Sequence, residues 1–234
     1  MRELITSMKG GDLPETGSEI RVVFFDATGT LLRVRGSVGE IYSELARRSG
    51  VETEPERIQS GFTRAFGAQP PLAFPIGTPE PELGRLEFEW WRRLVSQVFA
   101  GYDFPRFDEF FAEVFDYFGG REAWEVYDDV VPALKALKAR GLRLAVLSNF
   151  DRRLERLLRE LELDGYFDAI YISSRMGAAK PDPLIFREAL ARQQLRPSQA
   201  LHIGDSRRED FEGAAAAGIK PILIERSLER SGAA

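Results

Sequence analysis

A short apolar segment that ends abruptly in a carboxylate is the feature that most constrains this chain. Residues 20–25 are almost entirely apolar, rich in β-branched and aromatic side chains, and are followed by Asp26 and the turn residue Gly29. A run this short and this apolar predicts a buried strand of a parallel sheet. Asp26 would then lie at the carboxyl end of that strand, the edge at which open α/β sheets bind ligands. An ordinary strand followed by a turn would have the same sequence pattern, so this segment alone does not show that Asp26 binds a ligand.

The remainder of the chain alternates between strands and helices. Further strands are predicted at 142–147, 168–172, 200–203 and 221–224, and helical periodicity separates them. Such alternation predicts an α/β fold with a doubly wound, Rossmann-like parallel sheet.

Residues 36–120 break this rhythm. Apolar residues recur there at helical spacing, a loop with five prolines spans residues 69–81, and aromatic residues crowd the segment's end. We therefore expect a helical insertion after the first strand, an α/β core formed by residues 19–35 and 121–234, and a flexible leader over residues 1–18.

Polar residues stand at four strand ends of the predicted sheet. Besides Asp26 with Thr28 and Thr30, these are Ser148-Asn149, then Lys180-Pro181, then Gly204-Asp205 with Asp210 five residues further on. In this order the four motifs, over residues 20–226, resemble the haloacid dehalogenase-like superfamily of phosphotransferases and hydrolases. Four ordered motifs are far more specific than any one of them. The helical insertion of residues 36–120 resembles the cap domain of that superfamily, which closes over the active site and selects substrates.

The resemblance implies a Mg²⁺-dependent hydrolase of a small phosphorylated molecule. Asp26 would be the nucleophile and form an aspartyl-phosphate, and Lys180 would offset the negative charge. The phosphate would be held by Ser148, Asn149 and Thr30. Mg²⁺, which prefers oxygen ligands, would be bound by Asp26, the backbone carbonyl of Thr28, Asp205 and Asp210. Asp210 could instead be an acidic residue favoured in the first turn of a helix.

Thr28 departs from the family pattern. Most phosphatases of the superfamily carry there a second aspartate, which protonates the leaving alcohol, and such help is worth about 10²- to 10⁴-fold in rate. The phosphatase is therefore expected to be slow. A metal-independent 2-haloacid dehalogenase and a non-enzymatic phosphate-binding or regulatory protein are the alternatives, although Gly204-Asp205 counts against the dehalogenase.

Two other relatives without this aspartate fit less well. Phosphonatases use a lysine of the cap, and residues 33–120 contain none. The cation-pump ATPases need membrane helices, and no apolar run here is long enough. Residues 147–158 look particularly like one group of soluble, capped hydrolases that also lacks the second aspartate; the resemblance does not imply a substrate for it.

Composition excludes several classes of function. The net charge of −5 and the absence of a basic block argue against partners such as nucleic acid or an anionic membrane surface. Without cysteine, disulfides and thiolate chemistry are impossible. We expect a cytoplasmic protein, monomeric or homodimeric. The single histidine, His202, is assigned to core packing, and the four arginines of residues 152–159 are predicted to form a solvated helix face.

Overall fold

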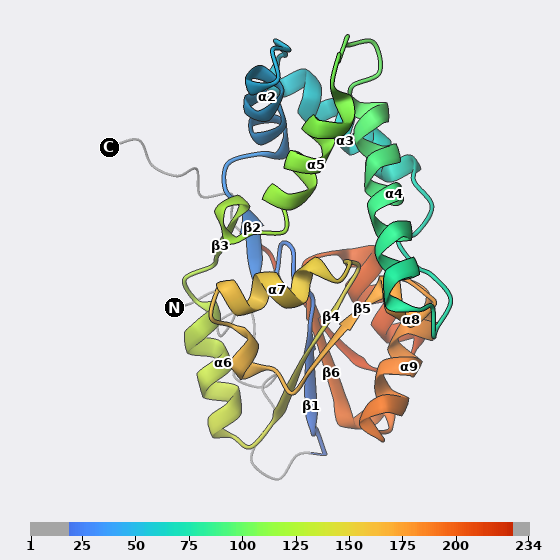
Figure 1. The fold of residues 1–234 in the computed structure, drawn as a ribbon. Helices are drawn as coiled ribbons and strands as arrows, with labels where there is room; N and C mark the ends of the chain where they lie inside the picture. Colours follow the sequence, from blue (N-terminus) through green and yellow to red (C-terminus); the bar gives the residue numbers. More distant parts are fainter. Residues whose placement is uncertain (1–18, 227–234) are drawn as a thin grey trace.

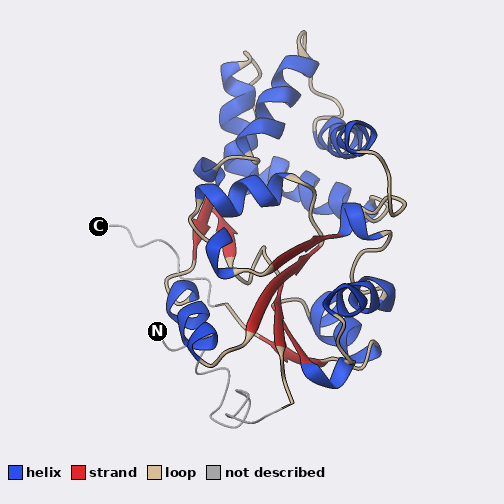
Figure 2. Cartoon of the chain, turned by 60° about the horizontal axis from the view of Figure 1, so that its bottom comes forward, coloured by secondary structure: helices blue, strands red, loops and turns tan. Residues whose placement is uncertain are grey.

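Strand β1 (Val22–Phe25) lies at the centre of a five-stranded sheet (Figures 1 and 2). The sheet order is β5-β4-β1-β6-β7, and every neighbouring pair is parallel. Strands that follow β1 in the chain add first on one side of it and then on the other, which is the doubly wound topology predicted from the sequence. The computed structural model describes residues 19–226. The other strands of the sheet are β4 (Arg143–Ser148), β5 (Ala169–Ile172), β6 (Ala200–Gly204) and β7 (Lys220–Leu223).

The register of the sheet brings the polar strand ends together. Phe25 pairs with Val146 on β4 and with Ile203 on β6. Asp26 follows Phe25 directly, so it lies at the same edge as Ser148 and Asp205, which end β4 and follow β6.

Helices cover both faces of the sheet because β1 alternates its side chains between them. Val23 and Phe25 belong to the apolar cluster that includes residues of helices α6 and α7. Val22 and Phe24 belong to a second cluster, with residues of α9 and α10. These helices are α6 (Val130–Ala139), α7 (Arg153–Glu160), α9 (Pro183–Gln193) and α10 (Gly213–Ala216).

Four further helices form a separate layer beyond the carboxyl edge of the sheet (Figure 1). We call α2–α5 the helical layer; it has its own apolar cluster, in which Tyr42, Leu94 and Phe110 are almost fully buried. Its first helix begins with a capping box, in which Ser37 accepts from the Glu40 N–H and Glu40 accepts from the Ser37 N–H. The four helices are α2 (Val38–Arg48), α3 (Pro55–Ala68), α4 (Glu80–Val98) and α5 (Phe107–Tyr117).

A two-stranded antiparallel ribbon joins the helical layer to the sheet. It pairs β2 (Leu32–Val34) with β3 (Trp124–Val126), so the chain enters and leaves the layer side by side. The ribbon was not predicted, because three-residue strands carry too little periodicity to be recognised. The remaining short elements are α8 (Ser173–Met176), η1 (Arg121–Ala123), η2 (Asp164–Tyr166), η3 (Pro197–Gln199) and the π-helical η4 (Arg207–Glu212).

The predicted fold class is therefore confirmed, with each strand end within two residues of its expected position. The domain limits at residues 36 and 120 stay a prediction. The predicted leader, residues 1–18, lies outside the described residues. Among residues 19–226, no helix is both long and apolar enough to cross a membrane.

Candidate active site

Asp26 is held on one side by a hydroxyl and an ammonium group. Its Oδ1 accepts hydrogen bonds from Ser148 Oγ at 2.9 Å and from Lys180 Nζ at 2.6 Å. All three side chains are buried. Oδ2 of Asp26 accepts no hydrogen bond from a side chain within residues 19–226, so one carboxylate oxygen is fixed while the other stays available for chemistry.

Lys180 reaches this site from a loop and not from a strand end, which corrects the sequence prediction. It lies eight residues beyond Ile172, where β5 ends, and α8 intervenes. Burial alone would lower the pKa of Lys180, but the carboxylates of Asp26 and Asp210 outweigh burial and raise the pKa. The ammonium group therefore stays charged over the whole physiological range of pH.

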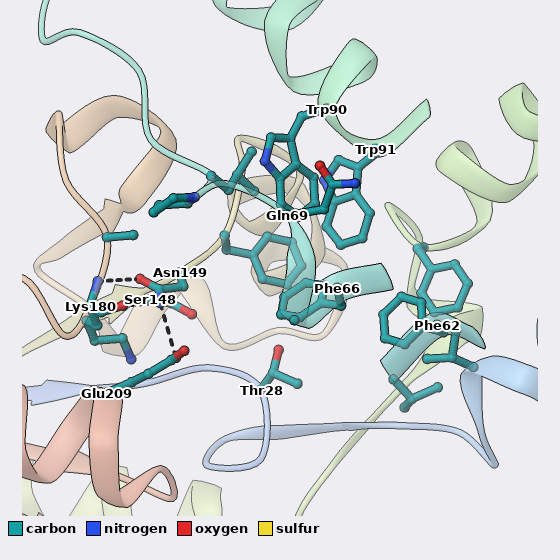
Figure 3. A pocket seen from close by; sticks show the side chains of 18 of the residues that line it. Thr28, Phe62, Phe66, Gln69, Trp90, Trp91, Ser148, Asn149, Lys180 and Glu209 are labelled. Atoms are coloured by element: carbon teal, nitrogen blue, oxygen red, sulfur yellow. Dashed lines mark hydrogen bonds between the residues drawn. The ribbon is translucent and has the colours of Figure 1, made fainter. Parts of the chain in front are cut away.

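Asn149 fixes the backbone of this loop (Figure 3). Its Oδ1 accepts from the Lys180 N–H at 2.7 Å, and its Nδ2 donates to the Lys180 carbonyl oxygen at 2.9 Å. The same Nδ2 donates to Glu209 at 3.1 Å. Because both ends of the Asn149 amide form hydrogen bonds in this way, the side chain positions Lys180. Only the backbone of Asn149 would then be left to bind phosphate.

Asp210 is the second buried partner of Lys180. Its Oδ1 lies 2.5 Å from Lys180 Nζ and 2.8 Å from His202 Nε2, and its Oδ2 accepts from the Ser206 N–H at 3.0 Å. Burial would raise the pKa of Asp210, but Lys180 and His202 lower it well below the usual range. Asp210 is therefore an ionised carboxylate that supports the lysine, and it lies in η4, at the fourth position of that segment.

His202 is a residue whose contact the sequence analysis missed. Its ring is fully buried, it packs edge-on against Phe186, and its Nε2 meets Asp210. Burial lowers the pKa of His202, which favours a neutral ring that donates from Nε2. A histidine inside an apolar strand gives no local signal of this contact, since its partner lies eight residues further along the chain.

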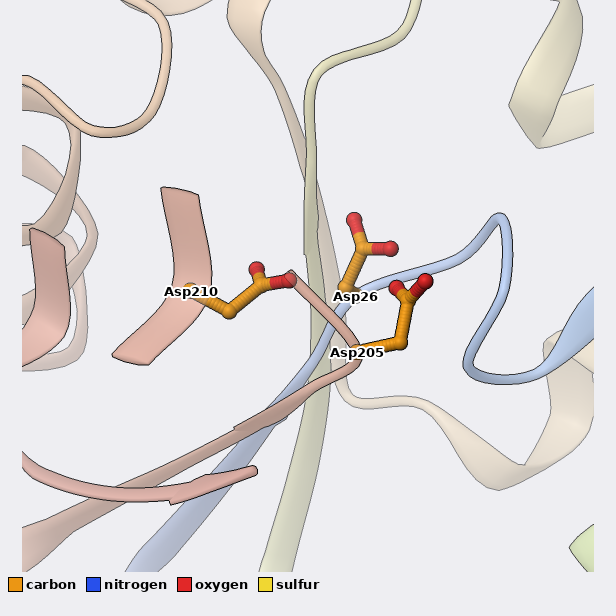
Figure 4. Close-up of side chains that lie close together, drawn as sticks. All are labelled: Asp26, Asp205 and Asp210. Atoms are coloured by element: carbon orange, nitrogen blue, oxygen red, sulfur yellow. The ribbon is translucent and has the colours of Figure 1, made fainter. Parts of the chain in front are cut away.

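Three carboxylates meet at the carboxyl edge of the sheet (Figure 4). Asp26, Asp205 and Asp210 each offer an oxygen, and these oxygens lie within 4.8 Å of one another. Burial, followed by the charges of the other two aspartates, raises the pKa of Asp205 to about 6. A cluster of hard oxygen donors with unbalanced negative charge suits Mg²⁺, so the residues present fit this ion.

The loop after β1 completes this edge. Thr30 is buried, and its Oγ1 donates to Asp205 Oδ1 at 3.3 Å. Thr30 thus orients a carboxylate, whereas the sequence analysis assigned it to the phosphate. Thr28 is exposed and lines the cavity (Figure 3). By the family resemblance, this is the position at which most phosphatases of the superfamily carry an aspartate.

A cavity of about 640 Å³ connects these residues to the helical layer. Its floor includes Asp26, Ser148, Lys180 and Asp205. Its opposite wall is aromatic, and Phe62, Phe66, Trp90 and Trp91 point into the same space in Figure 3. The volume is within the usual range of sites for small molecules.

A buried ion pair of the core, Asp151 with Arg153, contacts the helical layer beside this cavity. Asp151 is fully buried; its Oδ2 accepts from Trp91 Nε1 at 2.6 Å and from Arg153 Nη2 at 2.7 Å. The Arg153 guanidinium also lies 3.8 Å from the centre of the Phe115 ring. The predicted solvated face is therefore wrong for Arg153, whose side chain is only 11% exposed. The prediction considered α7 alone, and the contacts come from α4 and α5.

Comparison with known proteins shows the family of this chain. Residues 20–218 match the family described as haloacid dehalogenase-like hydrolase. The human haloacid dehalogenase-like hydrolase domain-containing protein 3 is 38% identical over 210 residues, covering 88% of this chain and 82% of the relative. This is the group to which residues 147–158 were found similar. The Drosophila melanogaster rhythmically expressed gene 2 protein is 30% identical over 224 residues, covering 88% of this chain and 84% of the relative.

Solved structures support the fold. A phosphatase from Thermococcus onnurineus superimposes with a TM-score of 0.60 at 22% identity, covering 91% of this chain and 89% of the other. A dehalogenase superimposes with a TM-score of 0.65 at 20% identity, covering 90% and 87%. Since both kinds of enzyme share the fold, the likeness leaves the reaction to be argued from the site.

Proposed function

Because the chain belongs to the haloacid dehalogenase-like hydrolases, we propose that it hydrolyses small phosphate monoesters with the help of Mg²⁺. The observation that carries this proposal is the asymmetric environment of Asp26. Ser148 and Lys180 occupy its Oδ1, which leaves Oδ2 as the nucleophile. A dehalogenase would need the same nucleophile but not the three clustered carboxylates, which point to a metal-assisted phosphoryl transfer.

In the first step, Asp26 Oδ2 attacks the phosphorus atom while the bond to the alcohol oxygen breaks. This yields an aspartyl-phosphate and an alcohol whose oxygen takes a proton from solvent. Water then attacks the phosphorus atom, releases inorganic phosphate and a proton, and restores the carboxylate. Lys180 and Ser148 would stabilise the negative charge of the phosphoryl oxygens throughout.

Asp26, Asp205, Asp210 and the backbone carbonyl of Thr28 would hold the ion. Mg²⁺, when bound, would neutralise the charge between the carboxylates and the phosphoryl group. Burial and the charge of Asp210 raise the pKa of Asp26, and the ammonium group of Lys180 acts against both, so Lys180 would favour the ionised nucleophile and hold it in place. The helical layer would act as the cap that encloses the alcohol, since it forms the wall of the cavity opposite Asp26.

The first test is phosphate release from a panel of aryl and alkyl phosphates, with Mg²⁺ and with a chelator. Wild type is expected to release phosphate only with Mg²⁺, and Asp26→Asn is expected to be inactive. Asp116→Asn, at an exposed aspartate on α5, serves as the matched control and should behave as wild type. Metal-dependent release that persists in Asp26→Asn would refute Asp26 as the nucleophile.

Two other outcomes would favour the alternatives. Chelator-resistant halide release from a 2-haloacid would identify a dehalogenase. Tight Mg²⁺-dependent binding of inorganic phosphate without turnover of any ester would identify a phosphate-binding protein. The exposed Thr28, in place of an acid, is the observation that favours this alternative.

A further inference from the structure

The wall of the cavity opposite Asp26 is made almost entirely of apolar surface. Five of its aromatic residues come from three helices of the layer: Phe62 and Phe66 from α3, Trp90 and Trp91 from α4, and Phe115 from α5. Phe66 is 45% exposed although it contacts the rings of both tryptophans. An apolar ring left this open at the edge of a cavity is suited to contact a ligand.

The polar groups of this wall are already paired within the protein. Trp90 Nε1 donates to the Pro70 carbonyl oxygen at 2.9 Å, and Trp91 Nε1 donates to Asp151 at 2.6 Å. Neither indole N–H is therefore free to bind the hydroxyl groups of a sugar or a polyol, and burying such hydroxyls without partners would be unfavourable.

Within residues 19–226, the one charged side chain that lines the aromatic wall is neutralised as well. Arg153 forms its ion pair with Asp151, and its Nη1 donates to the Phe115 carbonyl oxygen at 2.7 Å. The cations that face the phosphate end, Lys180 and the exposed Arg208, come from the core. Nothing in the aromatic wall would therefore balance a second anionic group on the alcohol.

One buried polar side-chain atom of the wall lacks a hydrogen-bond partner among residues 19–226. It is Gln69 Oε1, in an amide whose nitrogen donates to Gln97 Oε1. This single acceptor can serve one polar substituent on a ring, but not the several hydroxyl groups of a polyol.

From these contacts we propose that the substrate is a phosphomonoester of an uncharged alcohol with an aromatic ring or a comparably bulky apolar group. The proposal rests on the function proposed above, and it excludes sugar phosphates, phosphoglycerol and phosphocarboxylates as preferred substrates. The phosphate would lie at Asp26, and the ring would pack against Phe66 and the two tryptophans.

The test compares esters whose alcohols have similar basicity, so that leaving-group chemistry does not decide the result. Benzyl and phenethyl phosphate are compared with ethyl phosphate and glycerol 3-phosphate. We expect kcat/KM for benzyl phosphate to exceed that for ethyl phosphate by about tenfold or more, because one ring buries several carbon atoms, and glycerol 3-phosphate to be the poorest.

Phe66→Ala should remove most of the preference for benzyl over ethyl phosphate. Ile76→Ala is the matched control, because Ile76 is also about half exposed, at 51%, but lies outside the cavity. The ratio of kcat/KM values for the two esters should stay at the wild-type value in Ile76→Ala. An unchanged ratio in Phe66→Ala would overturn the placement of the ring.

Binding of non-hydrolysable phosphonates separates this inference from the proposed hydrolysis. Calorimetry with Mg²⁺ should show benzylphosphonate binding more tightly than ethylphosphonate, with a negative heat-capacity change. Tight benzylphosphonate binding without turnover of any ester would refute the hydrolase and support the apolar ligand class. Turnover of glycerol 3-phosphate as fast as that of benzyl phosphate would support the hydrolase and overturn the ligand class.

Discussion

Gly29 lies directly against the carboxylate of Asp205: a Cβ atom on Gly29 would be 2.2 Å from Asp205 Oδ2. Gly29 also has φ +83°, a conformation that side chains rarely adopt. The turn after the nucleophile strand and the carboxylate after β6 therefore fit together only because position 29 has no side chain.

Gly29→Ala is accordingly expected to weaken Mg²⁺ binding by about tenfold or more, since Asp205 must move away, and to lower kcat at fixed Mg²⁺. Gly50→Ala is the matched control, with φ +80° and no atom within 4 Å of the new Cβ. Both variants should lose about 1 kcal/mol of stability from the strained backbone. Calorimetric titration with Mg²⁺ distinguishes them, and equal affinities would argue against Asp205 as a ligand.

Thr28→Asp is expected to accelerate the hydrolysis of alkyl phosphates, by up to about 10²- to 10⁴-fold, because it supplies an acid to protonate the departing alcohol. Aryl phosphates with weakly basic phenols should gain much less. Thr28→Asn is the control, since its side chain has a similar shape but no proton to give. If Thr28→Asp gives no gain with alkyl esters, another group or a bound water already provides the proton.

The pH dependence of Mg²⁺ binding should follow Asp205. With a pKa of about 6, Asp205 is ionised at pH 7.5 and largely protonated at pH 5, so the apparent Mg²⁺ affinity should fall as the pH falls through 6. Calorimetric titrations between pH 5 and pH 8 measure this decline. An affinity that stays constant over this range would contradict the assignment.

The stability of the metal-free protein should change in the opposite direction. Because the folded-state pKa of Asp205 lies above its ordinary value of 3.8, ionised Asp205 destabilises the fold above pH 6 and ceases to do so toward pH 4. Asp205→Asn should therefore stabilise the chelator-treated protein at pH 7.5, by about 1 kcal/mol after allowance for solvent screening, and have little effect at pH 4. Denaturant unfolding at both pH values measures the difference. A stabilisation as large at pH 4 as at pH 7.5 would have another origin.

The sequence predicted the sheet and its polar edge because both are local signals. Asp26 and Asp205 directly follow short apolar strands, and parallel pairing brings such positions to one edge whatever the details of packing. Lys180 was identified only through its motif. It lies in a loop after α8, and hydrophobic periodicity does not predict the course of a loop. Arg153 shows a different limit: helix α7 alone predicts exposure, and only the contacts with Trp91 of α4 and Phe115 of α5 make it part of the cavity wall.

His202 illustrates the same limit within the core, and its contact leads to a last prediction. His202→Phe keeps the ring that packs on Phe186 but removes the Nε2 donor to Asp210. Asp210 would then retain only Lys180 and the Ser206 N–H, and Lys180 would be drawn toward it and away from Asp26. We expect kcat to fall by about tenfold, the order of one lost hydrogen bond to a buried charge.

His202→Gln tests whether the hydrogen bond or the ring matters, because its amide can donate to Asp210 without an aromatic ring. Recovery of kcat in His202→Gln but not in His202→Phe would assign His202 to the positioning of Asp210. If both variants lose activity in proportion to their loss of stability in denaturant unfolding, His202 serves only packing, as the sequence alone indicated.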